Sequence, residues 1–427
     1  MSSPPDTYFR KGFGLKAEVR EDLTADYAGW IVDLLRENEF TLTVGDVTVR
    51  LAREFGFCYG VERAVEYAYQ SRRKFPDRRI FLVGEIIHNP HVNEKLRRMG
   101  ITILEARDRG ESEPRFDYEA LRTDDVVVLP AFGVTIRDFE ALRALGCVVV
   151  DTTCGSVLNV WKRVDSYAED GFTALIHGKW YHEETRATAS QVRRFEGGQY
   201  VIVRDMAEAH VVRDCIAALG SGSGVAEAVA AFTSRLGHAV SPGFDPARHL
   251  RRLGVANQTT MLARESLAIA EEVGQAMERA FGAEYRAAHF RTFDTICSAT
   301  QDRQDAVLEL LAEPLDVMVV VGGFNSSNTM SLAMLCAEHV PTYHVEDAAN
   351  IDAARGEVRY RPAGTHHREE VARDWLPAAR PVRVGITAGA STPNNRIGEA
   401  VANIFATRGI PLDRARLATP DGSRSAS

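Results

Sequence analysis

The stretch CVVVDTTCGSVLNVWKRVDSYAE, residues 147–169, contains the pattern that decides the fold of this chain. An apolar run typical of a buried strand leads through Asp-Thr-Thr to Cys154, and the residues that follow repeat apolar positions at helical spacing. Two further stretches have the same order of strand, cysteine and helix. They are VTVRLAREFGFCYGVERAVEYAY around Cys58 and RTFDTICSATQDRQDAVLELL around Cys297.

The position of these cysteines predicts a shared chemistry. The unpaired N–H groups at the start of a helix favour a thiolate, and the thiolate is the form that ligates metal. We therefore predict that Cys58, Cys154 and Cys297 converge on one metal centre. Three protein ligands suit an iron–sulfur cluster with one iron left open to substrate. The alternative is that the three are buried thiols without a ligand.

Other apolar runs predict a fold of the α/β class. They are short, nearly continuous in apolar residues and separated by helical patterns, which is typical of parallel sheets covered on both faces. We predict strands at 79–87, 125–132, 147–153, 173–178, 200–205, 317–323, 342–347 and 382–389. The three similar cysteine junctions favour three small α/β units over one large sheet.

The cysteine positions also suggest domain boundaries. We predict an N-terminal extension over 1–45 with a helix near 26–38, and a first α/β domain over 46–153. A second α/β domain over 154–296 carries a helical insertion near 206–280, and a third spans 297–405. Residues 406–427 form a C-terminal tail, whose end, DGSRSAS, we expect to be disordered.

Composition excludes several classes of protein. The formal net charge of −8 gives no reason to expect a nucleic-acid partner. No apolar run approaches the roughly 20 residues that span a bilayer, and the N-terminus resembles neither a secretory signal nor a transit peptide. Six cysteines in 427 residues are too sparse for a disulfide framework, so we expect a cytoplasmic protein with reduced thiols.

Polar residues gather where predicted strands end, which is where open α/β sheets bind ligands. His88 follows the strand at 79–87, and the segment HEETRAT, with His182 and Glu184, follows the strand at 173–178. This segment lacks the second histidine of a zinc protease. The segments NQTTM, with Thr259, and GGFNSSNT and TAGAST have the same character. The last two bring Ser326, Ser327, Asn328 and Ser391 to two strand ends, where hydroxyl and N–H donors could bind one anion.

In order along the chain, these motifs resemble those of the 4-hydroxy-3-methylbut-2-enyl diphosphate reductase family, the last enzymes of the methylerythritol phosphate route to isoprenoids. The resemblance runs from about residue 45 to 402. The motifs that carry it are GFCYGVERA, EIIHNPHVN, DTTC, HEETRAT, NQTTM, DTICSATQDRQDA, GGFNSSNT and TAGASTP. The segments FRKGFGLKAEVR, HGKWYHEET and LPAFG are similar to the longer branch known from plastids and cyanobacteria, and the absence of a transit peptide favours a bacterial source.

The resemblance implies a trefoil of three α/β domains around one [4Fe–4S] cluster per chain, with Cys58, Cys154 and Cys297 as ligands. Glu184 would be the proton donor, and Thr259 would orient the substrate hydroxyl and relay the proton. The substrate diphosphate would be bound by His88, His182, Ser326, Ser327, Asn328 and Ser391. The short bacterial form has a further histidine at the position of Phe132, and we consider Lys179 as its replacement.

The implied reaction is reductive removal of the allylic hydroxyl to give isopentenyl and dimethylallyl diphosphates. The implied partners are the allylic diphosphate substrate and a ferredoxin or flavodoxin as electron donor, with no nucleic acid and no membrane, in a monomer or homodimer. One alternative is a three-cysteine cluster dehydratase similar to quinolinate synthase, which the hydroxyl-rich strand ends disfavour. A non-catalytic iron–sulfur sensor or carrier is the other, which lacks a fourth matched cysteine and a basic module.

Overall fold

The structure, a computed structural model, describes residues 7–107, 113–293, 295–365 and 368–414. The chain forms two compact units. The first comprises Met1–Lys16, Gly60–Ile87 and His91–Gln301, and the second comprises Ala17–Tyr59, His88–Pro90 and Asp302–Ser427. Among the described residues, no helix combines the length and apolar character that crossing a membrane requires.

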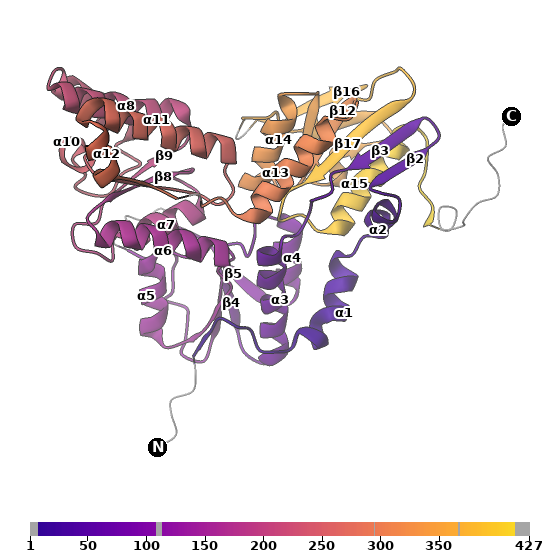
Figure 1. The fold of residues 1–427 in the computed structure, drawn as a ribbon. Helices are drawn as coiled ribbons and strands as arrows, with labels where there is room; N and C mark the ends of the chain where they lie inside the picture. Colours follow the sequence, from indigo (N-terminus) through magenta and orange to yellow (C-terminus); the bar gives the residue numbers. More distant parts are fainter. Residues whose placement is uncertain (1–6, 108–112, 294, 366–367, 415–427) are drawn as a thin grey trace. The chain divides into compact units, whose positions relative to one another are not determined.

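The first unit contains two parallel sheets (Figure 1). In the first sheet the strand order is β1 (Tyr8–Phe9), β7 (Val148–Asp151), β6 (Val126–Leu129), β4 (Ile80–Val83) and β5 (Ile101–Leu104), and all neighbours are parallel. Its helices are α3 (Tyr59–Lys74), α4 (Pro90–Arg98) and α5 (Ile136–Leu145). Leu142 of α5 packs on Val127 and Val149 of the sheet.

The second sheet has the order β11 (Phe290–Thr292), β10 (Leu253–Asn257), β8 (Thr173–His177) and β9 (Tyr200–Val203), again parallel throughout. Its helices are α6 (Gly155–Glu169), α7 (Glu183–Val192), α8 (Met206–Ser221), α9 (Val225–Leu236), α10 (Pro246–His249), α11 (Ala263–Phe281) and α12 (Ala283–His289). Helices α6 and α7 pack on one face of the sheet and α8 and α11 on the other (Figure 1). Because both faces are covered, the strands are apolar at nearly every position.

The second unit is built on the sheet β13 (Thr342–Val345), β12 (Val317–Val321), β17 (Val382–Ala388), β3 (Val47–Leu51) and β2 (Thr41–Val44). Its strands are parallel except for the β2–β3 hairpin. Its helices are α1 (Lys16–Tyr27), α2 (Trp30–Glu37), α13 (Ser298–Leu311), α14 (Ser327–Ala337) and α15 (Asn394–Ala406). A 3₁₀ helix (Ala348–Asn350) and a small antiparallel sheet of β14 (Ile351–Asp352), β15 (Glu357–Tyr360) and β16 (Glu370–Arg373) complete it.

The structure confirms an α/β fold with parallel sheets, and each of the eight predicted strand runs contains a strand. Two details differ. The helix predicted at 26–38 is α2 together with the end of α1, and the break falls at Gly29, where a Cβ would lie 2.5 Å from the carbonyl oxygen of Asn394. The region predicted as a helical insertion, 206–280, also contains β10, a strand between β8 and β11.

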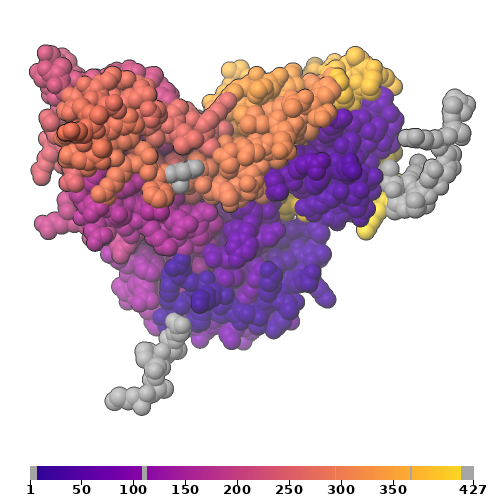
Figure 2. All heavy atoms as spheres, in the orientation of Figure 1, coloured from indigo at the N-terminus to yellow at the C-terminus, as the bar shows by residue number. Residues whose placement is uncertain are grey.

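One strand near residue 46 lies in a different sheet from the one that the predicted domain boundaries imply. Strand β3 pairs with β17 from the C-terminal part of the chain, although the predicted boundaries assign residues 46–51 to the first domain. A strand's apolar pattern shows that it is buried but not which strand it pairs with, so the sequence pattern could not reveal this pairing. Figure 2 shows these indigo residues beside the orange and yellow C-terminal elements of the same unit. Of the predicted tail, residues 415–427, including DGSRSAS, lie outside the described residues.

Candidate active site

Each of the three cysteines predicted to bind metal directly precedes a helix. Cys58 precedes α3, Cys154 is the N-cap residue of α6, and Cys297 precedes α13. All three are half-buried free thiols. The helix N-terminus beside each sulfur carries partial positive charge, which stabilises a thiolate. The structure therefore gives each of the three the environment of a metal ligand.

The other three cysteines are core residues. Cys147, Cys215 and Cys336 are buried among apolar side chains. Burial raises the pKa of all three thiols, to about 11 for Cys215 and about 12 for Cys336. A thiol that resists ionisation is a poor metal ligand, so the six cysteines divide into two sets of three by their environment.

An arginine of α3 donates hydrogen bonds to the turn that precedes Cys154. Arg63 donates to the carbonyl oxygens of Thr152 at 3.1 Å and Thr153 at 2.5 Å. The backbone N–H of Cys154 donates to the carbonyl of Ala131 at 2.8 Å. These bonds fix the turn that delivers Cys154 to the start of α6.

An exposed arginine of α6 contacts an aromatic residue four positions before Cys297. The Arg163 guanidinium lies 3.3 Å from the ring centroid of Phe293, a cation–π contact. The backbone N–H and the hydroxyl of Thr300 lie 3.3 and 3.0 Å from the Cys297 sulfur. The backbone N–H donates to the sulfur, and such a bond stabilises negative charge on sulfur.

The Cys58 junction, in the second unit, is held by an arginine of α13. Arg303 is 3 % exposed and donates to the carbonyl of Gly56 at 2.7 Å. The backbone N–H groups of Gly56 and Cys58 donate to the carbonyls of Ala388 and Ala390 at the end of β17. Gly56 has a φ of 67°, in the left-handed region that glycine adopts without strain.

A cavity of about 530 Å³ in the first unit lies at two of these helix starts. Ser156 and Asn159 line it from the first turns of α6, and Ile296, Cys297 and Ser298 line it from the start of α13. The Cys297 junction and the beginning of the Cys154 helix therefore share one cavity.

The predicted proton donor and its relay are in contact in the first unit. One carboxyl oxygen of Glu184 lies 2.6 Å from the backbone nitrogen of Thr259, and the other lies 3.0 Å from the Thr259 hydroxyl. Glu184 is 3 % exposed. The carbonyl of Thr259 lies 3.5 Å from the backbone nitrogen of Cys297, so one residue contacts both the acid and a cysteine junction. The sequence suggested both residues, and the structure brings them together.

His182 orients Glu184. His182 is the N-cap residue of α7, and its Nδ1 accepts from the backbone N–H of Glu184 at 3.2 Å. This bond requires Nδ1 without a proton, which leaves Nε2 as the donor nitrogen of a neutral ring. The ring of Phe132 meets that of His182 edge to face, with centroids 6.2 Å apart. Phe132 therefore positions a predicted diphosphate ligand by packing.

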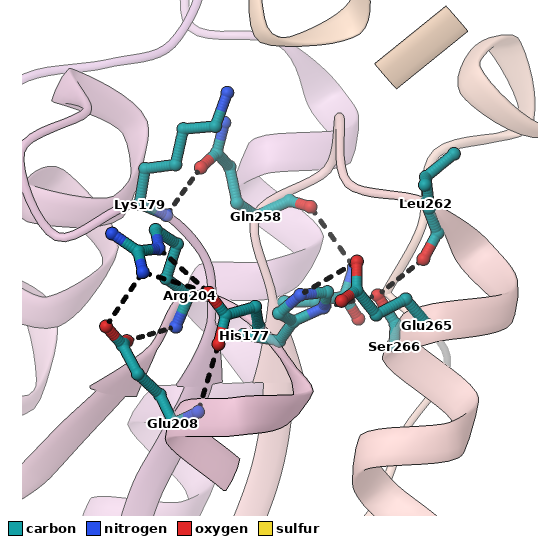
Figure 3. A network of polar contacts seen from close by, with 10 residues as sticks. His177, Lys179, Arg204, Glu208, Gln258, Leu262, Glu265 and Ser266 are labelled. Carbon is teal, nitrogen blue, oxygen red and sulfur yellow. Dashed lines mark hydrogen bonds and ion pairs between the residues drawn. The ribbon is translucent and has the colours of Figure 1, made fainter. Parts of the chain in front are cut away.

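Gln258 is the residue that connects these loops. Its Oε1 accepts from the Thr185 hydroxyl at 3.0 Å and from the backbone N–H of Lys179 at 3.1 Å, while its amide donates to the Thr260 hydroxyl at 2.8 Å. Figure 3 shows Gln258 beside Lys179. Burial lowers the pKa of Lys179 to about 8.

His177 ends β8 below this loop (Figure 3). Its Nδ1 lies 2.8 Å from the hydroxyl of Ser266, which contacts the carbonyl of Leu262, and its Nε2 lies 4.0 Å from a carboxyl oxygen of Glu265. Its carbonyl accepts from the backbone N–H of Gln258. Complete burial lowers the pKa of His177 to about 4, so the ring is neutral near pH 7.

The second unit brings together the other predicted diphosphate ligands. Strands β12 and β17 are parallel neighbours, so their carboxyl ends lie at the same edge. Ser391, after β17, lies 3.4 Å from the Ser326 hydroxyl and donates to the carbonyl of His88 at 3.1 Å. Asn328 accepts from the backbone N–H of Ala390.

Two features of this edge suit an anion. Ser326 is the N-cap residue of α14, and Ser327 is its first residue, so N–H groups of the helix start are present. Gly323 allows the chain to approach His88 closely, since a Cβ there would lie 2.5 Å from the carbonyl of His88. The structure thus groups His88, Ser326, Ser327, Asn328 and Ser391 in the second unit, while His182 belongs to the first.

Sequence reasoning did not single out Arg63, Arg163, Arg303 or His177. An arginine does follow each cysteine predicted to bind metal, at 63 − 58 = 5, 163 − 154 = 9 and 303 − 297 = 6 residues. This spacing is the only signal in the sequence. It does not reveal which carbonyl or ring each arginine meets, because those partners are distant in the chain.

Comparisons with known proteins agree with this architecture. The model of the family described as LytB protein matches residues 49–405. Two cyanobacterial relatives, each named 4-hydroxy-3-methylbut-2-enyl diphosphate reductase, are similar over nearly their full length. The Gloeobacter violaceus protein is 45% identical over 94% of this chain and 93% of the relative. The Thermosynechococcus vestitus protein is 44% identical over 95% and 96%.

A solved structure shares the fold. It is the E-1-hydroxy-2-methyl-but-2-enyl-4-diphosphate reductase from Plasmodium falciparum, with a TM-score of 0.59 and 20% identity over 85% of this chain and 89% of that chain. The fold and site define an α/β protein of parallel sheets with cysteines at helix starts. The chain belongs to the LytB protein family, which confirms the predicted resemblance. The quinolinate-synthase-like alternative is not supported, since the relatives are named reductases.

The low pKa of His177 predicts a loss of stability in acid. Because the folded pKa is about 4 and the ordinary value is 6.5, the unfolded chain binds the proton first as the pH falls. The free energy of unfolding should decrease between pH 6.5 and pH 4, by on the order of 3 kcal/mol for this group. Denaturant titrations across this range should show a shallower pH slope for His177→Gln. The exposed His339 provides the control, His339→Gln, which should keep the full slope. An unchanged slope in His177→Gln would contradict the assignment.

Proposed function

We propose that this chain reduces (E)-4-hydroxy-3-methylbut-2-enyl diphosphate to isopentenyl diphosphate and dimethylallyl diphosphate, the last step of the methylerythritol phosphate pathway. The substrate, two electrons and two protons give either product and one water. The contact between buried Glu184 and Thr259, next to the Cys297 junction, is the observation that carries the proposal. The relatives that bear this enzyme's name support it.

We propose that Cys58, Cys154 and Cys297 hold one [4Fe–4S] cluster per chain, with one iron open to substrate. The donor set fits, because these are the half-buried cysteines at helix starts and the other three are core residues. When bound, the cluster would supply electrons and a Lewis-acidic iron for the substrate hydroxyl. We further propose a trefoil of three α/β domains around it.

The arginine contacts support this ligand set. The helix after Cys58 provides Arg63 for the Cys154 junction, and the helix after Cys154 provides Arg163 for the Cys297 junction. The helix after Cys297 provides Arg303 for the Cys58 junction. Two of the cysteine turns are thereby fixed by hydrogen bonds from the helix that follows another cysteine, and the third has only a ring contact nearby.

Glu184 and Thr259 deliver the proton that departure of the hydroxyl requires. Hydroxide is a poor leaving group, so a protonated acid must act as the C–O bond breaks. A Glu184 carboxyl in its protonated form can donate through the Thr259 hydroxyl, which lies 3.0 Å away. His182 and Gln258 hold the two residues of this relay in place. His182 binds the backbone N–H of Glu184 at the start of α7. Gln258 binds the side chains of Thr185 and Thr260, which are the chain neighbours of Glu184 and Thr259.

The diphosphate would be bound by His88, His182, Ser326, Ser327, Asn328 and Ser391. Hydroxyl, amide and helix N–H groups can donate many hydrogen bonds without placing a formal charge near the reacting carbon. Binding energy from this end orients the hydroxyl that reacts. In this proposal Phe132 orients His182, and Lys179 in the same loop provides positive charge.

Three further proposals concern the setting of the enzyme. A ferredoxin or flavodoxin provides the electrons, since the reaction needs two and the substrate brings none. The chain acts as a monomer or homodimer. It acts in the cytoplasm, a location that fits six cysteines too sparse for a disulfide framework.

The decisive experiment is anaerobic turnover of (E)-4-hydroxy-3-methylbut-2-enyl diphosphate with excess reductant, on protein already assayed for iron and sulfide. Both isoprenoid diphosphates should form on protein that holds about four irons per chain. Loaded protein that forms neither product would refute the proposed function. Protein that binds no iron would refute the cluster.

Replacing the acid should separate chemistry from binding. Glu184→Gln should lower turnover by about 10²–10⁴-fold, the usual contribution of a general acid. Iron content and substrate affinity should remain, because the amide keeps the shape of the side chain. Glu196→Gln, on an exposed loop after α7, is the matched control and should retain turnover. Near-normal turnover in Glu184→Gln would remove this residue from the mechanism.

Replacing a ligand should remove the cluster. Cys154→Ser should yield protein with little iron and sulfide, because serine is a weak ligand for this cluster. Cys215→Ala, which alters a core cysteine of α8, should retain the full complement. Iron and sulfide analysis with absorption spectra of both variants provides the test. A full complement in Cys154→Ser would contradict the ligand assignment.

We expect the Thr300 hydroxyl to affect the reduction potential of the proposed cluster. Thr300→Val removes the hydroxyl 3.0 Å from the Cys297 sulfur but keeps the backbone N–H at 3.3 Å. The reduction potential should fall by tens of millivolts, because loss of a donor to sulfur disfavours the more negative reduced state. A redox titration followed by electron paramagnetic resonance measures this shift. The conservative variant Thr300→Ser should keep the potential, and a change of the same size there would argue against the hydrogen bond.

A further inference from the structure

A second cavity in the first unit, of about 630 Å³, plays no part in the proposed reaction. It lies at the start of α5, beside the outer side of α7 and the strand β9. Its volume falls within the range of small-molecule sites. Its lining includes five arginines, namely Arg115, Arg137, Arg186, Arg193 and Arg194.

The cavity is positively charged in a chain with a net charge of −8. Five arginines and two glutamates, Glu113 and Glu140, give 5 − 2 = +3 for its lining. Arg137 pairs with Glu140 at 2.9 Å, and Arg194 pairs with Asp165 at 3.2 Å. Within the described part of the chain, the guanidinium groups of Arg115 and Arg193 form no ion pair.

One observation strengthens the case for an anion: Nε of Arg115 is buried and has no hydrogen-bond partner among the described residues. Helix α5 also begins at the cavity, but its first N–H groups already have acceptors, since Ile136 donates to the Ser190 hydroxyl and Asp138 donates to the hydroxyl of its N-cap residue, Thr135. Guanidinium groups bind phosphate oxygens in pairs, which makes phosphate the chemistry that this arrangement recognises.

The remaining lining is mixed, with Thr135, Ser190, Tyr200 and His238 beside apolar residues. Ile136, Ala189, Ile202 and Ala239 line the cavity together with the ring of Trp180. A free phosphate would leave this surface uncovered, while an anion with a hydrocarbon chain would cover it.

We propose that this cavity binds an amphiphilic anion with a diphosphate head and a short hydrocarbon chain, and that binding lowers turnover. This chemical class includes the products of the proposed reaction and the longer diphosphates made by joining them. The proposed regulation rests on the proposed function, whereas the binding site rests on the cavity alone.

Helix α7 connects the cavity to the proposed acid. Arg186 lines the cavity two residues after Glu184, and its Nε donates to the carbonyl of Trp180 at 3.3 Å. Its backbone N–H donates to the carbonyl of His182 at 3.0 Å. A phosphate that draws the guanidinium away from Trp180 releases the loop that positions His182, and turnover falls.

The test uses geranyl diphosphate as the probe and the iron-loaded chain under anaerobic conditions. Isothermal titration calorimetry should show micromolar binding, and inorganic diphosphate should bind at least tenfold more weakly. The double variant Arg115→Ala/Arg193→Ala should bind geranyl diphosphate at least tenfold more weakly than the wild type. Arg235→Ala, on the exposed surface of α9, is the control and should bind normally.

Turnover measurements distinguish binding of the probe in this cavity from binding in the catalytic site. Without the probe, the double variant should turn over within twofold of the wild type. With the probe, the wild type should be inhibited even at saturating substrate, and the double variant should resist inhibition. Inhibition overcome by substrate and unaffected by the variant would place the probe in the catalytic site and overturn the proposal.

Other outcomes of these experiments also test the proposal. Equal affinity for inorganic diphosphate would overturn the amphiphilic ligand. If a reduced ferredoxin, rather than geranyl diphosphate, lost affinity in the double variant, the arginines would be a protein docking surface. A loaded chain with no turnover that still binds geranyl diphosphate through Arg115 and Arg193 would refute the proposed function and leave the binding site in place.

Discussion

The contacts made by Arg63, Arg163 and Arg303 are the constraint on which the site depends. A strand-to-helix turn that carries a ligand has few hydrogen bonds of its own, and its carbonyl groups point away from the sheet. A guanidinium can satisfy such acceptors from another element of the fold, as Arg63 does before Cys154 and Arg303 does before Cys58, whereas Arg163 contacts an aromatic ring. Here each arginine comes from the helix that follows a different cysteine. Within each unit, the turn before the cysteine therefore depends on a residue that is distant in the chain.

The sequence allowed prediction of the local elements and the chemistry but not of the long-range pairing. The valine-rich runs at 126–129 and 317–321 are strands because both faces of their sheets are covered, a pattern readable from composition alone. Cys154, Glu184 and Thr259 stood out because they follow strands. The partner of β3, the targets of the three arginines and the role of Gln258 depend on contacts between residues far apart in the chain. The periodic spacing of apolar residues along the sequence does not encode such contacts, so the structure was needed to find them.

The chain provides two contrasting environments for phosphate. At the ends of β12 and β17, serine and asparagine side chains with helix N–H groups make a neutral, pre-formed edge. At the start of α5, arginines line a cavity that also has apolar and hydroxyl-bearing side chains. Neutral donors suit a group that must be held in one orientation while charge changes nearby, whereas long arginine side chains adapt to ligands of several lengths. The difference in donors thus parallels the difference between the two proposed tasks, orienting a reactant and sensing a related molecule.

The pairing of β3 with β17 has a consequence for synthesis on the ribosome. Val47 pairs with Val382, and Ile386 with Leu51, so the strand that precedes Cys58 has no neighbour on that side until almost the whole chain has emerged. Arg303, Ala388 and Ala390, which fix the Cys58 turn, also arrive late. The first unit can fold while translation continues, but a nascent chain released before residue 390 lacks the contacts with the end of β17 that fix the Cys58 turn. The Cys58 turn is thereby completed only in nearly finished molecules, whereas the contacts at the Cys154 and Cys297 turns can form earlier.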